Sequence, residues 1–246
     1  MMTSVKQSPD EKMDSFWAKR LANLKPIILP LCFFGTTNIK TGGVEKTKFS
    51  FLPETETVQE ILPQSDLLLA ALLSYLARLL NVYSYDIGYT TTSLQSSTES
   101  DETSVKYVPL HVDLDSEQTI EEFCTSMKKE LIHIKKCKNY ICNDSSRHSD
   151  LRTTLEDFEK TVSVNVAVVD HVEDLESDIT QKVTFIIPKN ASEIISFYDP
   201  AYITEGGISQ LLHHFSIFIQ GIISNPSLPL SKQPLLNEKE RNQVLN

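Results

Sequence analysis

The chain has 246 residues, of which 40% are hydrophobic and 23% are charged, and its formal net charge at pH 7 is −10. This length allows one large hydrophobic core or two small ones, and the composition is that of an ordinary soluble globular protein. The negative charge argues against a nucleic-acid-binding surface, which needs clustered lysines and arginines. The lysine-rich run from Lys128 to Lys138 lies within a predicted helix, and we interpret it as a solvated helix face.

Neither a membrane-spanning segment nor a secretion signal is visible in the sequence. The apolar run that begins at Leu67 is interrupted by Tyr75 and Arg78, well short of the roughly 20 residues that a bilayer requires. Residues 1–12 lack the apolar stretch of a signal peptide. The four cysteines have no Cys-x-x-Cys spacing, so we expect reduced structural thiols rather than a zinc site. We therefore expect a cytoplasmic protein with no membrane or nucleic-acid partner.

The first predicted helix begins with a capping box at Ser8-Pro9-Asp10-Glu11, in which Ser is the N-cap and Pro takes the first helical position. Its apolar residues recur at helical spacing, which predicts one buried face. These residues are Met13, Phe16, Trp17, Leu21 and Leu24. Lys25-Pro26 ends the helix. A short strand follows, in which Phe49 and Phe51 alternate with polar residues.

The second predicted helix, from Leu67 to about Val82, is apolar on almost all sides, so we expect most of its surface to be buried. Directly after it, large side chains from Tyr83 to Tyr89 alternate with small or polar ones, which predicts a half-buried strand. Residues 92–104 are rich in Ser, Thr, Asp and Glu without an apolar period. We expect a mobile loop there.

A second strand and helix follow this loop. Alternation from Val108 to Leu114 predicts the strand, and Thr119-Ile120-Glu121-Glu122 is a capping box that opens the helix. The predicted apolar face of this helix consists of Ile120, Phe123, Met127, Leu131 and Ile134. Residues 139–150 are polar and predict a second loop.

Three more strands are predicted in succession, at Val162–Val168, Val183–Ile187 and Ile194–Phe197. A long helix from about Glu205 to Ser224 follows, with Gly206-Gly207 in its first turn. Helices alternate with strands early in the chain, and the later strands run consecutively. This order predicts an α/β fold, a mixed-sheet α/β sandwich within one domain.

The last predicted element is an exit segment, which we define as residues 228–236, followed by a charged helix. Two prolines restrict the backbone of this segment, so we expect it to lie extended against the domain. Asn237 with Glu240 predicts an N-cap, and the helix that starts there presents Val244 to a shared surface. We therefore predict an interdomain interface formed by Pro234, Leu235, Leu236, Arg241 and Leu245.

The order of these elements resembles the C-terminal lobe of a condensation domain of nonribosomal peptide synthetases. Phe16–Pro26 resembles the Tyr-Trp-containing helix that begins that lobe, and Val105–Asp113 resembles its Asn-Thr-Leu-Pro-Leu-Arg strand. The segment from Leu211 to Leu245 resembles the exit into an adenylation domain. The resemblance implies one lobe of the chloramphenicol-acetyltransferase-like fold. The family's tunnel motifs are weak here, because the Asn-Thr pair is not recognisable and Asn139-Tyr140-Ile141-Cys142 replaces Pro-Phe-Glu.

The family's catalytic motif, His-His-x-x-x-Asp-Gly, is not found in this sequence. His213-His214 is followed by Phe215-Ser216-Ile217 without the Asp and Gly, so we interpret this pair as structural. His111 lies two residues from Asp113 on a predicted strand, and we interpret these two as a solvent-side pair rather than a catalytic one. We expect no catalytic, cofactor-binding or metal-binding residue in this chain.

The resemblance implies a truncated, non-catalytic domain over residues 1–230, with residues 231–246 as the linker and start of an adenylation domain. Its expected role is a structural platform for that domain. ATP, magnesium and phosphopantetheine would bind to neighbouring domains and not to this chain. Two alternatives remain open: a docking module that recruits an upstream synthetase subunit through its acidic surface, and an acyltransferase half that needs a separate N-terminal lobe.

Overall fold

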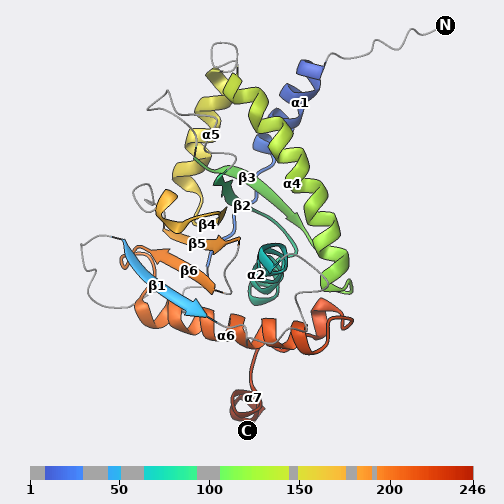
Figure 1. Ribbon diagram of the computed structural model, residues 1–246, viewed down its shortest axis with the longest axis vertical. Helices are drawn as coiled ribbons and strands as arrows, with labels where there is room; N and C mark the ends of the chain where they lie inside the picture. The colour runs from blue at the N-terminus through green and yellow to red at the C-terminus, as the bar shows by residue number, and fades with distance from the viewer. Residues whose placement is uncertain are drawn as a thin grey trace, which may run out of the picture.

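The computed structural model describes residues 9–29, 44–50, 64–92, 106–143, 149–175, 182–189 and 193–245. Within these ranges six strands form one sheet in the order β1-β6-β5-β4-β2-β3 (Figure 1). Strand β2 pairs with β4, and β4 with β5, in parallel, whereas the other neighbours are antiparallel. The strands are β1 (Glu45–Ser50), β2 (Ser84–Thr91), β3 (Val108–Asp113), β4 (Val164–Val169), β5 (Val183–Pro188) and β6 (Glu193–Tyr198). The predicted mixed-sheet α/β fold is confirmed.

Helices pack on this sheet and beside it. Figure 1 shows α2 between the sheet and α4, with α6 below α2 and the edge strand β1 in this view, and α2 contacts β5, α4 and α6. The α-helices are α1 (Pro9–Ala22), α2 (Gln64–Leu80), α4 (Ile120–Asn143), α5 (Ser149–Thr161), α6 (Glu205–Ser224) and α7 (Glu238–Leu245). Two short 3₁₀ helices are η3 (Val172–Asp174) and η5 (Leu230–Lys232).

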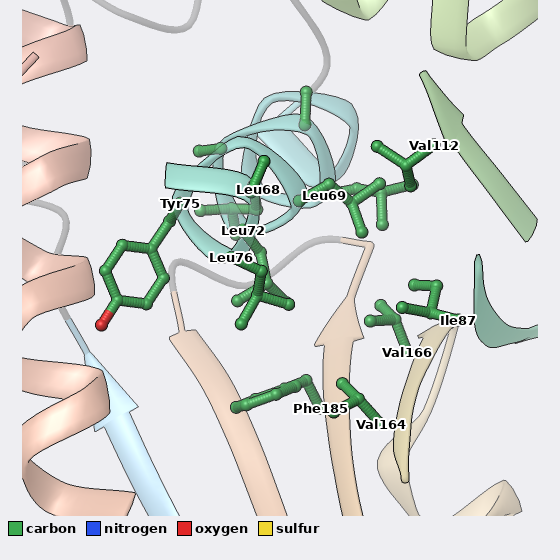
Figure 2. Packing of buried hydrophobic residues seen from close by; sticks show 14 of the residues in the cluster. Leu68, Leu69, Leu72, Tyr75, Leu76, Ile87, Val112, Val164, Val166 and Phe185 are labelled. Carbon is green, nitrogen blue, oxygen red and sulfur yellow. The ribbon is translucent and has the colours of Figure 1, made fainter. Parts of the chain in front are cut away.

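Helix α2 is the centre of the main core. Every residue from Leu67 to Ala77 is buried, as its all-round apolar sequence predicts. Figure 2 shows side chains of α2 directed toward residues of the sheet, including Val166 and Phe185. The buried Tyr75 hydroxyl donates to the Leu211 carbonyl of α6 at 2.9 Å, so its polar end is satisfied inside the core.

Two expectations about local structure are wrong. Strand β2 is not half-buried, because its residues from Tyr85 to Thr90 are all buried and they belong to both faces of the strand. The loop expected at 139–150 is also wrong, since α4 continues to Asn143 and α5 begins at Ser149. Helix α5 was missed, although Leu155 and Phe158 lie three residues apart on one buried face. The loop expected at 92–104 lies outside the described residues from position 93 onward.

Candidate interdomain surface and the histidine sites

The exit segment lies against the domain as expected, but part of it is the 3₁₀ helix η5 rather than the extended path that the prolines predict. Leu230 is fully buried, and its backbone N–H donates to the Gln118 carbonyl at 2.9 Å. The next N–H, of Ser231, donates to the Ser116 carbonyl at 2.8 Å. These bonds fasten the exit segment to the turn that precedes α4.

A charged side chain from the core helix holds the same segment. Nη1 of Arg78, in the last turn of α2, donates to the carbonyls of Leu230 and Gln233. Burial lowers the pKa of the Arg78 guanidinium, but the ordinary value is so high that the group stays charged. Two carbonyls of the exit segment are therefore bound by one cation, and such charge-assisted bonds are stronger than neutral ones.

The side chain of Gln233 closes the turn at the start of the exit segment. It is only 2% exposed, and its Nε2 donates to the carbonyls of Asn225 at 3.0 Å and Leu228 at 3.3 Å. Next to it, Pro234 lies against Gly221 of α6. A Cβ added at Gly221 would come within 2.5 Å of Pro234 Cδ, so only glycine allows this approach.

The predicted interface residues gather only in part. Leu235 is half-buried and packs against the main core, Leu236 is half-buried, and Pro234 is exposed on its outer side. Arg241 is exposed on α7, and the side chain of Leu245 lies outside the described residues. Positions 234–236 therefore form one surface beside the end of α6, while Arg241 lies on the following helix.

Helix α7 begins with the predicted capping box. The Asn237 N–H donates to Glu240 Oε2 and the Glu240 N–H donates to Asn237 Oδ1, each at 2.9 Å. The other carboxylate oxygen of Glu240 lies 3.0 Å from His213 Nε2 and 3.9 Å from His214 Nε2. The Asn237 hydrogen bond lowers the pKa of Glu240, and burial lowers the pKa of His214. This histidine pair therefore has a structural partner, which joins α6 to α7.

The interpretation of His111 as a partner of Asp113 is wrong. The register of β2 and β3 places Asp86 opposite His111, and His111 Nδ1 lies 2.9 Å from Asp86 Oδ1. The Asp86 side chain is only 1% exposed, and its second oxygen accepts the Lys25 N–H at 2.6 Å. The His111 ring is 32% exposed, so one of its edges reaches solvent. A buried carboxylate that orients an imidazole is an arrangement that catalytic sites also use.

Sequence reasoning missed Asp86, although one signal could have pointed to it. It is a single acidic residue within an otherwise uncharged strand, and a charge placed there must be paired if it is buried.

Among the described residues no group of three or more potential metal ligands comes together. None of the helices in the described part of the chain combines the length and apolar character needed to cross a membrane.

No family model matches the sequence, and no curated protein matches it. Solved structures match the fold. The starter condensation domain of rhizomide synthetase RzmA is 13% identical, with a TM-score of 0.57 over 93% of this chain and 55% of that one. The first condensation domain of the calcium-dependent antibiotic synthetase is 9% identical, with a TM-score of 0.58 over 94% and 55%.

A multidomain protein also contains this fold. The four-domain nonribosomal peptide synthetase AB3403, in its holo form bound to AMP and glycine, is 10% identical, with a TM-score of 0.66 over 97% of this chain and 21% of that one. The chain spans about half the length of the condensation-domain structures that it matches. Its fold is thus that of part of a condensation domain.

Proposed function

We propose that the chain is a non-catalytic condensation-like domain of a nonribosomal peptide synthetase and serves as a structural platform for an adenylation domain that follows it. The observation that carries this proposal is the fastened exit segment. Arg78, Gln233 and the backbone bonds of Leu230 and Ser231 hold the chain rigidly just where it would pass into the next domain. A rigid exit restricts the orientations that a following domain can take.

The sequence supports the absence of the family's condensation chemistry. Acyl transfer to an amine needs a positioned base or hydrogen-bonding group beside the nucleophile. The motif that supplies this group in the family does not occur in the chain, and His213 and His214 face Glu240 instead. In this proposal ATP, magnesium and phosphopantetheine act in neighbouring domains.

The half-buried leucines of the exit segment offer a direct test. In the protein extended through an adenylation domain, Leu235→Asp and Leu236→Asp should loosen the two domains, because burying an unpaired carboxylate costs several kcal/mol. Leu228→Asp is the matched control, since this leucine of the same segment is exposed. Small-angle scattering and crosslinking would measure the interdomain contacts. Equal contacts in all three variants would contradict the proposal.

The His111–Asp86 pair favours one alternative, an acyltransferase half that works with a separate N-terminal lobe. In that case His111 Nε2 would be the reactive nitrogen, because Nδ1 faces the buried carboxylate. The test incubates the chain, with and without a condensation-domain N-terminal lobe, with an acyl thioester and an amine. Turnover that His111→Ala abolishes and His213→Ala leaves intact would establish the alternative and overturn the non-catalytic assignment.

A further inference from the structure

Helix α4 exposes an isoleucine in the middle of its outer face. Its buried face carries Ile120, Phe123, Met127 and Ile134, none of which is more than 5% exposed. Ile132, in contrast, is 57% exposed. The other large apolar residues that are exposed in the described ranges lie outside helices and strands; they are Ile28, Val44, Val82 and Leu228. Packing in the core therefore does not account for the apolar side chain of Ile132.

Four lysines surround Ile132 on the helix surface. Lys128, Lys129, Lys135 and Lys136 lie three or four residues away on either side, which are the positions adjacent to Ile132 on an α-helix. Of the four, only Lys128 forms an ion pair with a carboxylate among the described residues, to Asp66 at 3.3 Å. We call Ile132 and these four lysines the α4 patch.

The charges of the α4 patch are not compensated from within α4. The acidic residue nearest to its centre, Glu130, is bound by Arg20 of α1 at 2.6 Å. Lys129, Lys135 and Lys136 are exposed beside the apolar side chain of Ile132. A basic patch with an apolar centre thus stands on a chain whose net charge is −10. The interpretation of this run as a plain solvated face accounts for the lysines but not for Ile132.

We propose that the α4 patch is a docking surface for an acidic amphipathic α-helix of a partner protein. The matching helix would place one apolar side chain against Ile132 and carboxylates three and four residues to either side of it. Burial of Ile132 would supply the affinity, as buried apolar anchors do in interfaces. The lysine–carboxylate pairs would orient the helix and speed its association. The proposal is independent of the platform function.

Other occupants fit the α4 patch less well. Nucleic acid is bound mainly through its phosphates, so it would engage the four lysines without burying Ile132. A membrane surface needs a continuous apolar face. A two-fold contact between copies would bring the same lysines together, which is repulsive. The charge pattern therefore favours an acidic protein helix.

The test uses a synthetic helical peptide with a central leucine, glutamates three and four residues to either side, and a fluorescent label. Titration with the 246-residue chain is followed by fluorescence anisotropy at low and at physiological salt. Binding should weaken about tenfold or more in Ile132→Ser, because the apolar contact is lost. The double change of Lys129→Glu and Lys135→Glu should abolish binding. Circular dichroism checks that the variants fold, as expected for exposed positions.

Two controls test whether the effect belongs to the α4 patch. Val82→Ser removes another exposed apolar residue, and Lys160→Glu reverses another exposed lysine. Both should leave peptide binding unchanged. The proposal is overturned if the peptide does not bind, if Ile132→Ser binds as tightly as the wild type, or if the controls weaken binding equally. Tighter Ile132-dependent binding to an RNA oligonucleotide or to phosphatidylserine vesicles would also overturn it.

Discussion

Replacing Gly221 by alanine should push the exit segment away from α6, even though the same change in an isolated helix is stabilising. The added Cβ would lie 2.5 Å from Pro234 Cδ, 2.7 Å from Pro234 Cγ and 2.9 Å from Gln233 Oε1. The proline ring is rigid, so the segment itself must move. Movement of Gln233 would also strain the bonds from its Nε2 to Asn225 and Leu228.

The expected magnitude of the Gly221→Ala effect combines two opposing contributions. Alanine in place of glycine stabilises a helix interior by up to about 1 kcal/mol. Overpacking costs about 1–3 kcal/mol, and weakening one buried hydrogen bond costs about 1 kcal/mol more. We expect a net loss of about 1–3 kcal/mol in the free energy of unfolding. Gly206→Ala is the matched control in the same helix, because nothing lies within 4 Å of its added Cβ.

Urea unfolding of the two variants measures this difference, and hydrogen exchange locates it. Gly206→Ala should raise the free energy of unfolding slightly, whereas Gly221→Ala should lower it and speed amide exchange at Leu230 and Ser231, whose N–H groups are bonded in the wild type. If both variants are stabilised equally and exchange at these two amides is unchanged, the exit segment does not contact α6 in solution. The central observation behind the platform function would then be lost.

Three further predictions concern buried or partly buried polar groups. Asp86→Ala should lower the free energy of unfolding in urea by about 3 kcal/mol, because the bonds to the Lys25 N–H and the His111 ring are lost; a change below about 0.5 kcal/mol would contradict the observed pairing. Burial lowers the pKa of His214, so the unfolded chain protonates first as the pH falls, and stability present above about pH 6.5 is lost below it. In His214→Phe the free energy of unfolding should therefore change less between about pH 7 and pH 6 than in the wild type. An unchanged pH dependence would refute the lowered pKa of His214. Burial raises the pKa of the Cys124 thiol to about 12, so mass spectrometry should find it unalkylated by iodoacetamide at pH 8 until the chain unfolds; rapid modification of the folded chain would refute its burial.

Local sequence patterns determined the elements whose signals lie within one segment. The sequence of α2, apolar on almost all sides, predicted its burial, and the capping boxes at Thr119 and Asn237 predicted the starts of α4 and α7. Alternation of apolar and polar residues predicted the strands. The prolines correctly predicted that the exit segment lies against the domain, but the extended path was wrong at Leu230–Lys232, which form the 3₁₀ helix η5. These features depend on neighbours a few residues apart, so periodicity and capping rules are sufficient for them.

Only the tertiary structure decided which distant residues meet. Spacing shows that His111 and Asp113 share a strand face, but the partner of His111 is Asp86, 25 residues away, and this pairing depends on the register of β2 against β3. In the same way, the alternating sequence of β2 predicts one exposed face, but residues on both of its faces are buried in the folded chain, and Gly221 is required because Pro234 packs against it. Periodicity describes one element at a time, whereas register and packing depend on how all the elements fit together.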